Sequence, residues 1–150
     1  MSEDHRLHSV SVALHSVSVA GIVVDDEGRV LLIQRRDNRH WEPPGGVLEL
    51  GETFEEGVVR EVLEETGVRV TVERLTGVYK NMTRGIVALV YRCRPISGSA
   101  GPTDEAAKTA WLAPAELPDL MTTAYLVRVE DAFSEHASSR SHNGLTLFPL

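Results

Sequence analysis

Short apolar runs rich in β-branched residues recur along the chain between turn-forming segments, and they predict five strands. The strands are expected at residues 16–24, 29–35, 68–79, 85–93 and 108–112. The sequence Asp-Asp-Glu-Gly between the first two strands is typical of a tight turn, so these strands are expected to form a hairpin. Residues 37–46 and the Gly- and Ser-rich residues 95–102 are expected to form loops.

Two segments carry helical signals. Thr53 followed three residues later by Glu56 predicts a capping box at the start of the first helix, and Gly67 is expected to end that helix in a left-handed conformation. The second helix, expected at residues 122–136, is indicated by three apolar residues at helical spacing, Leu126, Val129 and Phe133. The order strand, strand, helix, strands, helix predicts an α/β sandwich.

The N-terminus contains a repeat, because residues 7–13 and 14–20 both read LHSVSVA. Side chains in a strand alternate with a period of two, so a repeat of odd length inverts the face that its valines occupy. The second copy is therefore expected to enter the first strand. We expect an arm at residues 1–13, disordered or forming an added strand, a domain at residues 14–137, and a loosely held C-terminal tail at residues 138–150. An added edge strand would also allow a homodimer.

The composition fits one domain and excludes several classes of protein. The chain has 150 residues, of which 42% are hydrophobic, which is enough to form a single core. Its apolar runs are too short to span a membrane, and its N-terminus does not resemble a secretory signal. A single cysteine, Cys93, excludes an internal disulfide and a multi-cysteine metal site. A cytoplasmic protein without a membrane partner is expected.

The net charge of −7 is concentrated in one segment. Residues 49–65 contain seven glutamates and a single basic residue, Arg60, and so carry −6 of that charge. Clustered like charges destabilise a fold unless a counter-charge is present, so this segment predicts a bound cation. The remaining residues are nearly balanced in charge and do not indicate a basic surface for duplex nucleic acid.

Three of these glutamates, Glu61, Glu64 and Glu65, have the spacing i, i+3, i+4. This spacing places their carboxylates on one face of the predicted helix. Such an oxygen-rich face suits a hard cation such as Mg²⁺ or Mn²⁺, which also binds phosphate oxygens. Val58 and Val62 provide apolar positions with which the same helix can pack against a core.

Residues 46–68 read GVLELGETFEEGVVREVLEETGV and meet every fixed position of the pattern G-x5-E-x7-R-E-U-x-E-E-x-G-U, where U is a bulky aliphatic residue. In this pattern the sequence resembles the Nudix hydrolase family. An E-x5-W segment at residues 105–111 also resembles the family. The resemblance implies an α/β/α sandwich with a mixed β-sheet between helices, in which these residues form a loop, a helix and a second loop.

The resemblance also implies the chemistry, which is the attack of water on phosphorus in a diphosphate linkage. Mg²⁺ or Mn²⁺ would be bound by the three glutamates, Glu61, Glu64 and Glu65, together with the backbone carbonyl of Gly46. Arg60 would orient a neighbouring carboxylate, either Glu61 or Glu52. The general base stays open among three carboxylates, Glu61, Glu64 and Glu105.

The expected substrate is a small nucleoside diphosphate derivative, such as a nucleoside triphosphate, a nucleotide sugar or ADP-ribose. The candidates for substrate binding are five basic residues and one glycine, namely Arg35, Arg36, Arg39, Lys80, Arg84 and Gly45. Arg35 ends a strand that leads toward the glycine pair, and Gly45 permits close approach of the backbone. The alternatives are a non-catalytic nucleotide sensor on the same scaffold and an enzyme acting on non-nucleotide diphosphates.

Overall fold

The computed structural model describes residues 11–149 and arranges their strands in two sheets. The larger sheet has, in spatial order, β4 (Gly45–Val47), β1 (Ser16–Val23), β6 (Ile86–Gly98), β5 (Val68–Asn81) and β8 (Ser138–His142). The smaller sheet has the order β3 (Trp41–Glu42), β2 (Val30–Arg35) and β7 (Ala106–Leu112). β1 pairs with β6 in parallel, whereas β5 pairs with β6 antiparallel, so the larger sheet is mixed.

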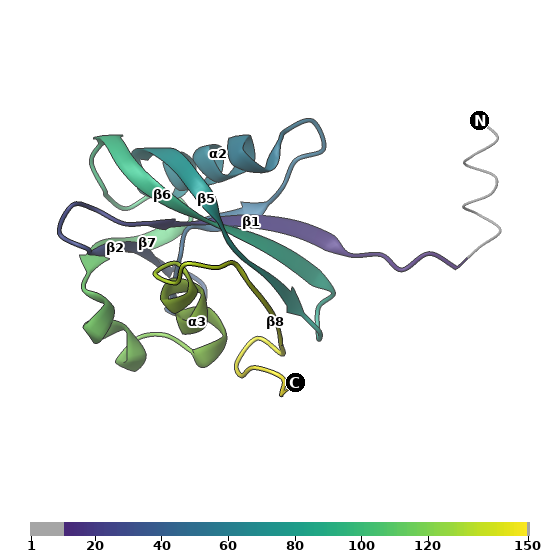
Figure 1. The fold of residues 1–150 in the computed structure, drawn as a ribbon. Coiled ribbons are helices and arrows are strands. Elements are labelled where there is room, and N and C mark those ends of the chain that lie inside the picture. Colours follow the sequence, from purple (N-terminus) through teal and green to yellow (C-terminus); the bar gives the residue numbers. More distant parts are fainter. Residues whose placement is uncertain (1–10, 150) are drawn as a thin grey trace.

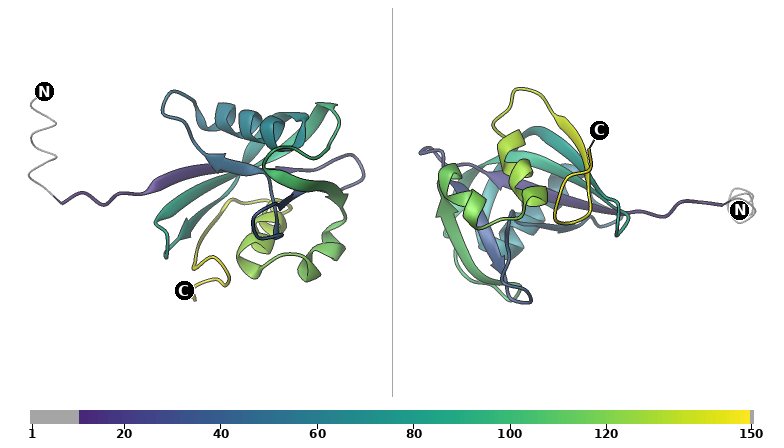
Figure 2. Two further views of the ribbon diagram at one scale, coloured as in Figure 1. Left: turned by 180° about the vertical axis from the view of Figure 1, so that it is seen from behind. Right: turned by 90° about the horizontal axis from the view of Figure 1, so that it is seen from below.

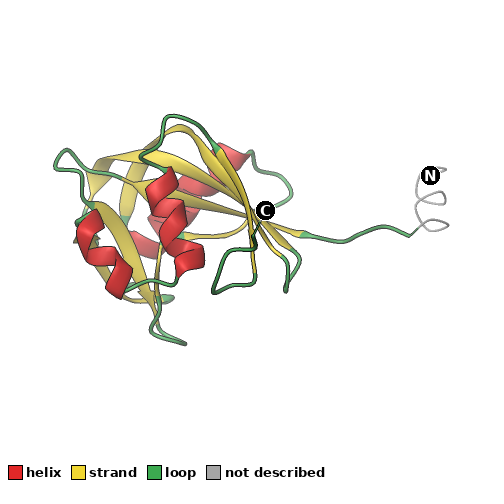
Figure 3. Cartoon of the chain, turned by 60° about the horizontal axis from the view of Figure 1, so that its bottom comes forward, coloured by secondary structure: helices red, strands yellow, loops and turns green. Residues whose placement is uncertain are grey.

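Helices cover the strands from opposite sides (Figure 1). The helix α2 (Phe54–Thr66) lies on one side, and α3 (Thr123–Asp131) lies on the other after a short 3₁₀ helix, η1 (Pro114–Asp119). Figure 3 shows the helices on the outside of the strands. This arrangement confirms the expected α/β/α sandwich with a mixed sheet. None of the helices within residues 11–149 has the length and apolar character needed to cross a bilayer.

β1 contributes to two cores because its side chains alternate between the faces of the sheet. Ile22 belongs to the cluster on the α3 side, whereas Val19 packs in the cluster that contains Val58 and Val62 of α2. Gly21 permits this close packing of α2 on β1, since a Cβ atom there would lie 3.0 Å from Cγ2 of Val62. The apolar face predicted for the first helix is therefore confirmed.

The boundaries of α2 agree with the signals in the sequence. Thr53 is the N-cap, and its side chain and that of Glu56 form both hydrogen bonds of a capping box. Gly67 ends the helix with φ 82°, a conformation that costs little without a Cβ atom, and its N–H donates to the carbonyl of Leu63. These local interactions set the orientation of the glutamate-rich turn relative to the sheet.

The predicted hairpin of the first two strands is wrong. Val24 and Val30 form an isolated antiparallel bridge, after which β1 and β2 enter different sheets. β1 is paired with β6 along its whole length and with β4 at Ser18–Ala20 on its other edge, whereas β2 pairs with β3 and β7. The loop expected at residues 37–46 contains the two short strands β3 and β4.

Two further segments differ from the expected boundaries. Residues 95–98, expected to lie in a loop, continue β6, because β5 pairs with them as far as Gly98. Pro95 is tolerated there because pairing with β1 ends at Cys93 and leaves that edge of β6 open. The second helix ends at Asp131 instead of residue 136.

The structure also differs in part from what was expected at both ends of the chain. Residues 138–142, expected to belong to a loosely held tail, form β8 in parallel with β5, and His142 is fully buried. The second copy of the N-terminal repeat enters β1 at Ser16, as predicted. Residues 11–15 have no regular secondary structure and extend away from the domain (Figures 1 and 2). Most of the first copy lies outside the described residues.

Candidate active site

The strand β4 brings the glycine pair of the loop against the acidic face of α2. A Cβ atom at Gly46 would lie 2.7 Å from the carboxylate of Glu61, and a Cβ atom at Gly45 would collide with the backbone carbonyl of Val19. Both positions therefore need glycine for the strand to lie this close to α2 and β1. The pair thus approaches a glutamate carboxylate and the backbone of β1 closely, while its approach to a metal or a phosphate stays a prediction.

Glu65 is held by the glycine pair. The backbone N–H of Gly45 donates a 2.6 Å hydrogen bond to Oε1 of Glu65, and only 4% of the residue is exposed. Burial raises the pKa of this carboxyl group to about 8, although the Gly45 N–H opposes the shift. Nearby Glu61 and Glu105 raise the pKa further by repulsion. Without a cation, Glu65 therefore carries a proton near neutral pH.

Glu61 is also buried, but a guanidinium group accompanies it. Nη1 of Arg60 donates to Oε1 of Glu61 at 2.8 Å, and Nε of Arg60 donates to Oε2 of Glu52 at 2.9 Å. Burial raises the pKa of Glu61 while Arg60 lowers it, whereas Arg60 lowers the pKa of Glu52 to about 2. Arg60 thus contacts both carboxylates that the sequence offered as its partner.

Glu64 lies apart from its two neighbours on the helix. Its side chain is 60% exposed and reaches only the edge of the Arg60 guanidinium, at 3.4 Å. The i and i+4 glutamates face β4, while the i+3 glutamate is rotated toward solvent. The spacing suggested that the three carboxylates would face the same point. In the structure, Glu61 and Glu65 do so and Glu64 does not.

A cavity of about 450 Å³ opens beside the two buried glutamates. Its lining combines carboxylates with basic groups and the glycine pair; among these are Gly45, Gly46, Glu61, Glu65, Glu105, Asp104, Arg35 and Arg36. The structure thus brings Glu105 and Arg35 to the predicted glutamates. Asp104 was missed by the sequence reasoning, and the only signal for it was its position next to Glu105.

Hydrogen bonds from Arg36 and to Glu65 hold the loop that carries Glu105. Arg36 donates to the carbonyls of Thr103 and Asp104 at 2.8 and 3.1 Å. The hydroxyl of Thr103 donates to the carbonyl of Glu65 at 3.2 Å. These contacts hold the loop so that the exposed carboxylate of Glu105 lies at the mouth of the cavity. Within residues 11–149, no basic side chain forms an ion pair with it.

The remaining substrate-binding candidates are placed differently. Arg35 binds Asp37 through Nη2 at 2.7 Å and Glu42 through Nη1 at 3.2 Å. Arg84 does not line the acidic cavity, but together with Arg35 it lines a neighbouring cavity of about 440 Å³. Lys80 lines neither of these cavities.

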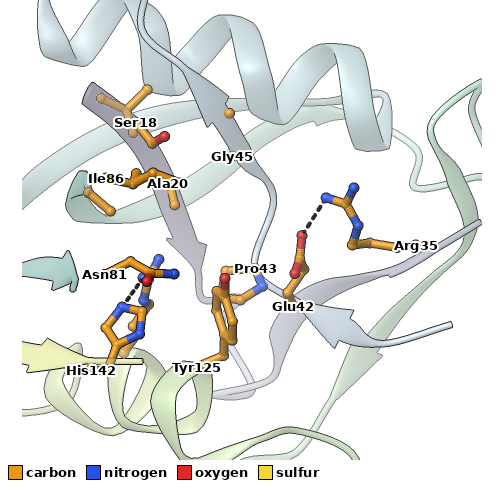
Figure 4. Close-up of a pocket in the computed structure, with 14 residues that line it drawn as sticks. Ser18, Ala20, Arg35, Glu42, Pro43, Gly45, Asn81, Ile86, Tyr125 and His142 are labelled. Carbon is orange, nitrogen blue, oxygen red and sulfur yellow. Dashed lines mark hydrogen bonds and ion pairs between the residues drawn. The ribbon is translucent and has the colours of Figure 1, made fainter. Parts of the chain in front are cut away.

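A smaller cavity of about 160 Å³ adjoins the acidic one and shares Arg35, Gly45 and Gly46 with it. Its other polar lining comes from β1, β3, β5, α3 and β8, and Figure 4 shows Ser18, Glu42, Asn81, Tyr125 and His142 around it. None of these residues was predicted from the sequence. No motif signals them, because they come together only through packing of distant elements.

The donor chemistry of the acidic cavity fits a hard divalent cation. Two buried carboxylates, those of Glu61 and Glu65, face a backbone strand of glycines, and carboxylate and carbonyl oxygens are the ligands that such cations prefer. Within residues 11–149, however, no three His, Cys, Asp or Glu side chains are already assembled at ligand distance. Glu61 is turned toward Arg60, and Glu64 toward solvent.

Comparison with known proteins identifies the family of the chain. Residues 14–131 match the model of the NUDIX domain family. A MutT-like protein of Streptomyces ambofaciens is 54% identical over 142 residues, which cover 94% of this chain and 92% of that protein. An ADP-ribose pyrophosphatase of Methanocaldococcus jannaschii is 33% identical over 114 residues, covering 71% of this chain and 68% of the relative.

A solved structure shows the same fold. The crystal structure of a NUDIX hydrolase from Nitrosomonas europaea aligns with a TM-score of 0.76, covering 91% of this chain and 85% of that one, at 22% identity. The chain therefore belongs to the NUDIX domain family and is a Nudix pyrophosphohydrolase.

Proposed function

We propose that the acidic cavity hydrolyses the diphosphate linkage of a nucleoside triphosphate, a nucleotide sugar or ADP-ribose with Mg²⁺ or Mn²⁺. One observation carries the proposal: Glu61 and Glu65 are buried against the glycine pair on one wall of a cavity that also contains Arg35 and Arg36. Carboxylates suit a cation and guanidinium groups suit phosphate oxygens, so the cavity offers both partners of a metal-bound diphosphate.

The residues that would hold the cations are Glu61, Glu65 and Glu64, with the backbone carbonyl of Gly46. When bound, divalent cations neutralise phosphate oxygens and lower the pKa of a water molecule. Arg60 positions Glu61 through the 2.8 Å hydrogen bond and holds Glu52 on its other side. Glu64 needs only a change of side-chain rotamer, because it is exposed and weakly held.

The chain supplies the remaining functions from outside α2. Arg35 and Arg36 line the cavity and bind the phosphates that lie away from the glutamates. Glu105 accepts the proton of the attacking water, since it lines the cavity without an ion-pair partner among residues 11–149, whereas Glu61 is engaged by Arg60. The hydrogen bond from the hydroxyl of Thr103 to the carbonyl of Glu65 positions the loop that carries this carboxylate.

A panel of nucleotides tests the proposal. The protein is incubated with nucleoside triphosphates, ADP-ribose and nucleotide sugars in Mg²⁺, in Mn²⁺ and in EDTA, and products are resolved by chromatography. We expect at least one nucleotide to be cleaved between phosphates, only with a divalent cation. Binding of nucleotides without any cleavage would contradict the proposal and favour the nucleotide-sensor alternative.

A further inference from the structure

Arg128 of α3 is a buried cation, and the carboxylate of Glu42, which lines the same cavity, attracts it without forming an ion pair with it. Only 7% of the residue is exposed, and among residues 11–149 it forms no salt bridge. Its Nε atom has no hydrogen-bond partner in this part of the chain. An arginine stays charged in proteins, so burying it without acceptors is costly. The fold therefore retains at this position a group whose donors are unsatisfied.

The one polar contact of Arg128 does not satisfy it. Nη2 of Arg128 lies 3.3 Å from Nε2 of His142, which is fully buried. The backbone N–H of Gly144 donates to Nδ1 of His142 at 2.9 Å, so the neutral ring carries its proton on Nε2. Burial and the neighbouring Arg128 both lower the pKa of His142 and keep the ring neutral. The contact between Arg128 and His142 thus joins two donors.

Aromatic rings contact the guanidinium but leave its N–H groups free. Its Cζ atom lies 4.9 Å from the ring centroid of Tyr79 and 4.6 Å from that of Tyr125. Stacking of this kind offsets part of the cost of burial and holds the plane of the group. The N–H groups along its edge still need oxygen or nitrogen acceptors, which the described part of the chain does not supply.

Arg128 lines the 160 Å³ cavity, and a second donor faces the same space. Oδ1 of Asn81 accepts from the backbone N–H groups of Thr83 and Arg84 at 3.0 and 3.1 Å, which leaves its NH₂ group free to donate. Asn81 lies beside His142 at the cavity in Figure 4. The cavity is therefore arranged for a ligand that presents acceptors to Arg128 and Asn81.

The ligand chemistry follows from the other residues around this cavity. The carboxylate of Glu42 lines it and would repel a phosphate, whereas Arg35 and Arg36 offer phosphates a place in the adjoining acidic cavity. The ring of Tyr125 gives the cavity an aromatic wall. A flat, neutral group with carbonyl oxygens satisfies these conditions, and in a nucleotide that group is the base.

We infer that Arg128 determines base specificity by donating to a carbonyl oxygen of the nucleobase, an inference that rests on the proposed nucleotide hydrolysis. Hypoxanthine and guanine present O6 beside N7, and uracil presents O4, all of which are acceptors. Adenine and cytosine present an amino group at the corresponding position. There the donors of Arg128 meet a donor, and both groups lose their partners.

Two matched pairs of substrates test this inference, because ITP and ATP, and likewise UTP and CTP, differ at the carbonyl or amino position. In the unaltered protein we expect kcat/KM for the carbonyl member of at least one pair to exceed its partner by about tenfold or more. Arg128→Met removes the donors and keeps an apolar chain, and it should bring that ratio close to one. Arg92→Met is the control: Arg92 also stacks on an aromatic ring, Phe133, and lines neither cavity.

Equilibrium binding of IMP and AMP separates this inference from the proposed function. If no nucleotide is cleaved, the proposed hydrolysis fails, and preferential binding of IMP that is lost in Arg128→Met still supports the role of Arg128. Equal kcat/KM within both pairs together with equal binding of IMP and AMP would overturn the inference. So would a preference that persists in Arg128→Met. If this variant does not fold, Arg128→Lys, which loses the planar fork, replaces it, and the unaltered protein's ratios remain decisive.

Discussion

The backbone amide of Gly45 donates a 2.6 Å hydrogen bond to the carboxyl group of Glu65, twenty residues later in the chain. This contact joins the short strand β4 to the last turn of α2 and buries Glu65 beside Glu61. Burial raises the pKa of this carboxyl group to about 8, at a position where we propose that a divalent cation binds. Several of the following predictions depend on this relationship.

Replacing Glu65 with Gln should reduce cation-dependent turnover by about a hundredfold or more while the fold persists. The amide oxygen of Gln can still accept from Gly45 but is a weaker cation ligand than a carboxylate. Steady-state kinetics and thermal unfolding are measured together. Glu55→Gln, on the exposed part of the same helix, is the matched control and should leave turnover unchanged. A fully active Glu65→Gln protein would contradict the metal assignment.

The cation-free protein should become less stable as pH rises from about 4.5 to about 8. Folded Glu65 keeps its proton up to about pH 8, while the unfolded chain loses it near the ordinary value of 4.5. The native state then binds more protons than the unfolded state, so the free energy of unfolding falls with pH, by at most about 1.4 kcal/mol per pH unit for one group. Urea unfolding in EDTA at several pH values measures this slope.

The Glu65→Gln protein isolates that effect, because its other titrating groups are the same. Its free energy of unfolding should fall less steeply over this pH range than that of the unaltered protein. Identical slopes for the two proteins would show that Glu65 is ionised in the cation-free fold.

Gly46→Ala should reduce both turnover and affinity for the divalent cation. The added Cβ atom would lie 2.7 Å from the carboxylate of Glu61, so the glutamate or β4 must move. A displacement of this size at a reacting centre costs about tenfold to a hundredfold in rate. Gly51→Ala is the control, since a Cβ atom there meets no neighbour within 4 Å. Equal effects of the two substitutions would contradict the close approach.

Arg60→Lys should lower turnover although the positive charge remains. Lysine cannot make the paired hydrogen bonds to Glu52 and also reach Glu61, both of which Arg60 contacts. Loss of a residue that orients a metal ligand typically costs about tenfold to a hundredfold. Titration of activity with Mg²⁺ measures the effect, and exposed Arg69→Lys serves as the control. An unchanged Mg²⁺ dependence would show that Arg60 does not position Glu61.

Glu105→Gln should reduce kcat with little effect on the concentration of Mg²⁺ needed for half-maximal activity. The carboxylate lines the cavity but lies outside the glutamate helix, so its loss removes a proton acceptor rather than a principal ligand. If kcat is unchanged, the base is another carboxylate.

The sequence was most informative where a structure depends on near neighbours. The capping box of Thr53 and Glu56 and the left-handed Gly67 are interactions within one or two helical turns, and α2 was predicted with its correct ends. The glutamate helix was likewise predicted from the residue pattern of positions 46–68, and its binding of a cation stays a prediction. In contrast, the predicted hairpin was wrong, because which strand pairs with β1 depends on β6, more than sixty residues away.

The same distinction between local and long-range interactions applies to the candidate site. The sequence by itself determined the glutamate helix, the glycine pair and their family, because these depend on residue type and short spacing. Only the tertiary structure decided that Glu64 faces solvent while Glu65 is buried, since burial depends on β4 packing over one side of α2. It also brought Arg128 and His142 to one cavity, because α3 and β8 pack against the sheet through contacts that leave no local pattern in the sequence.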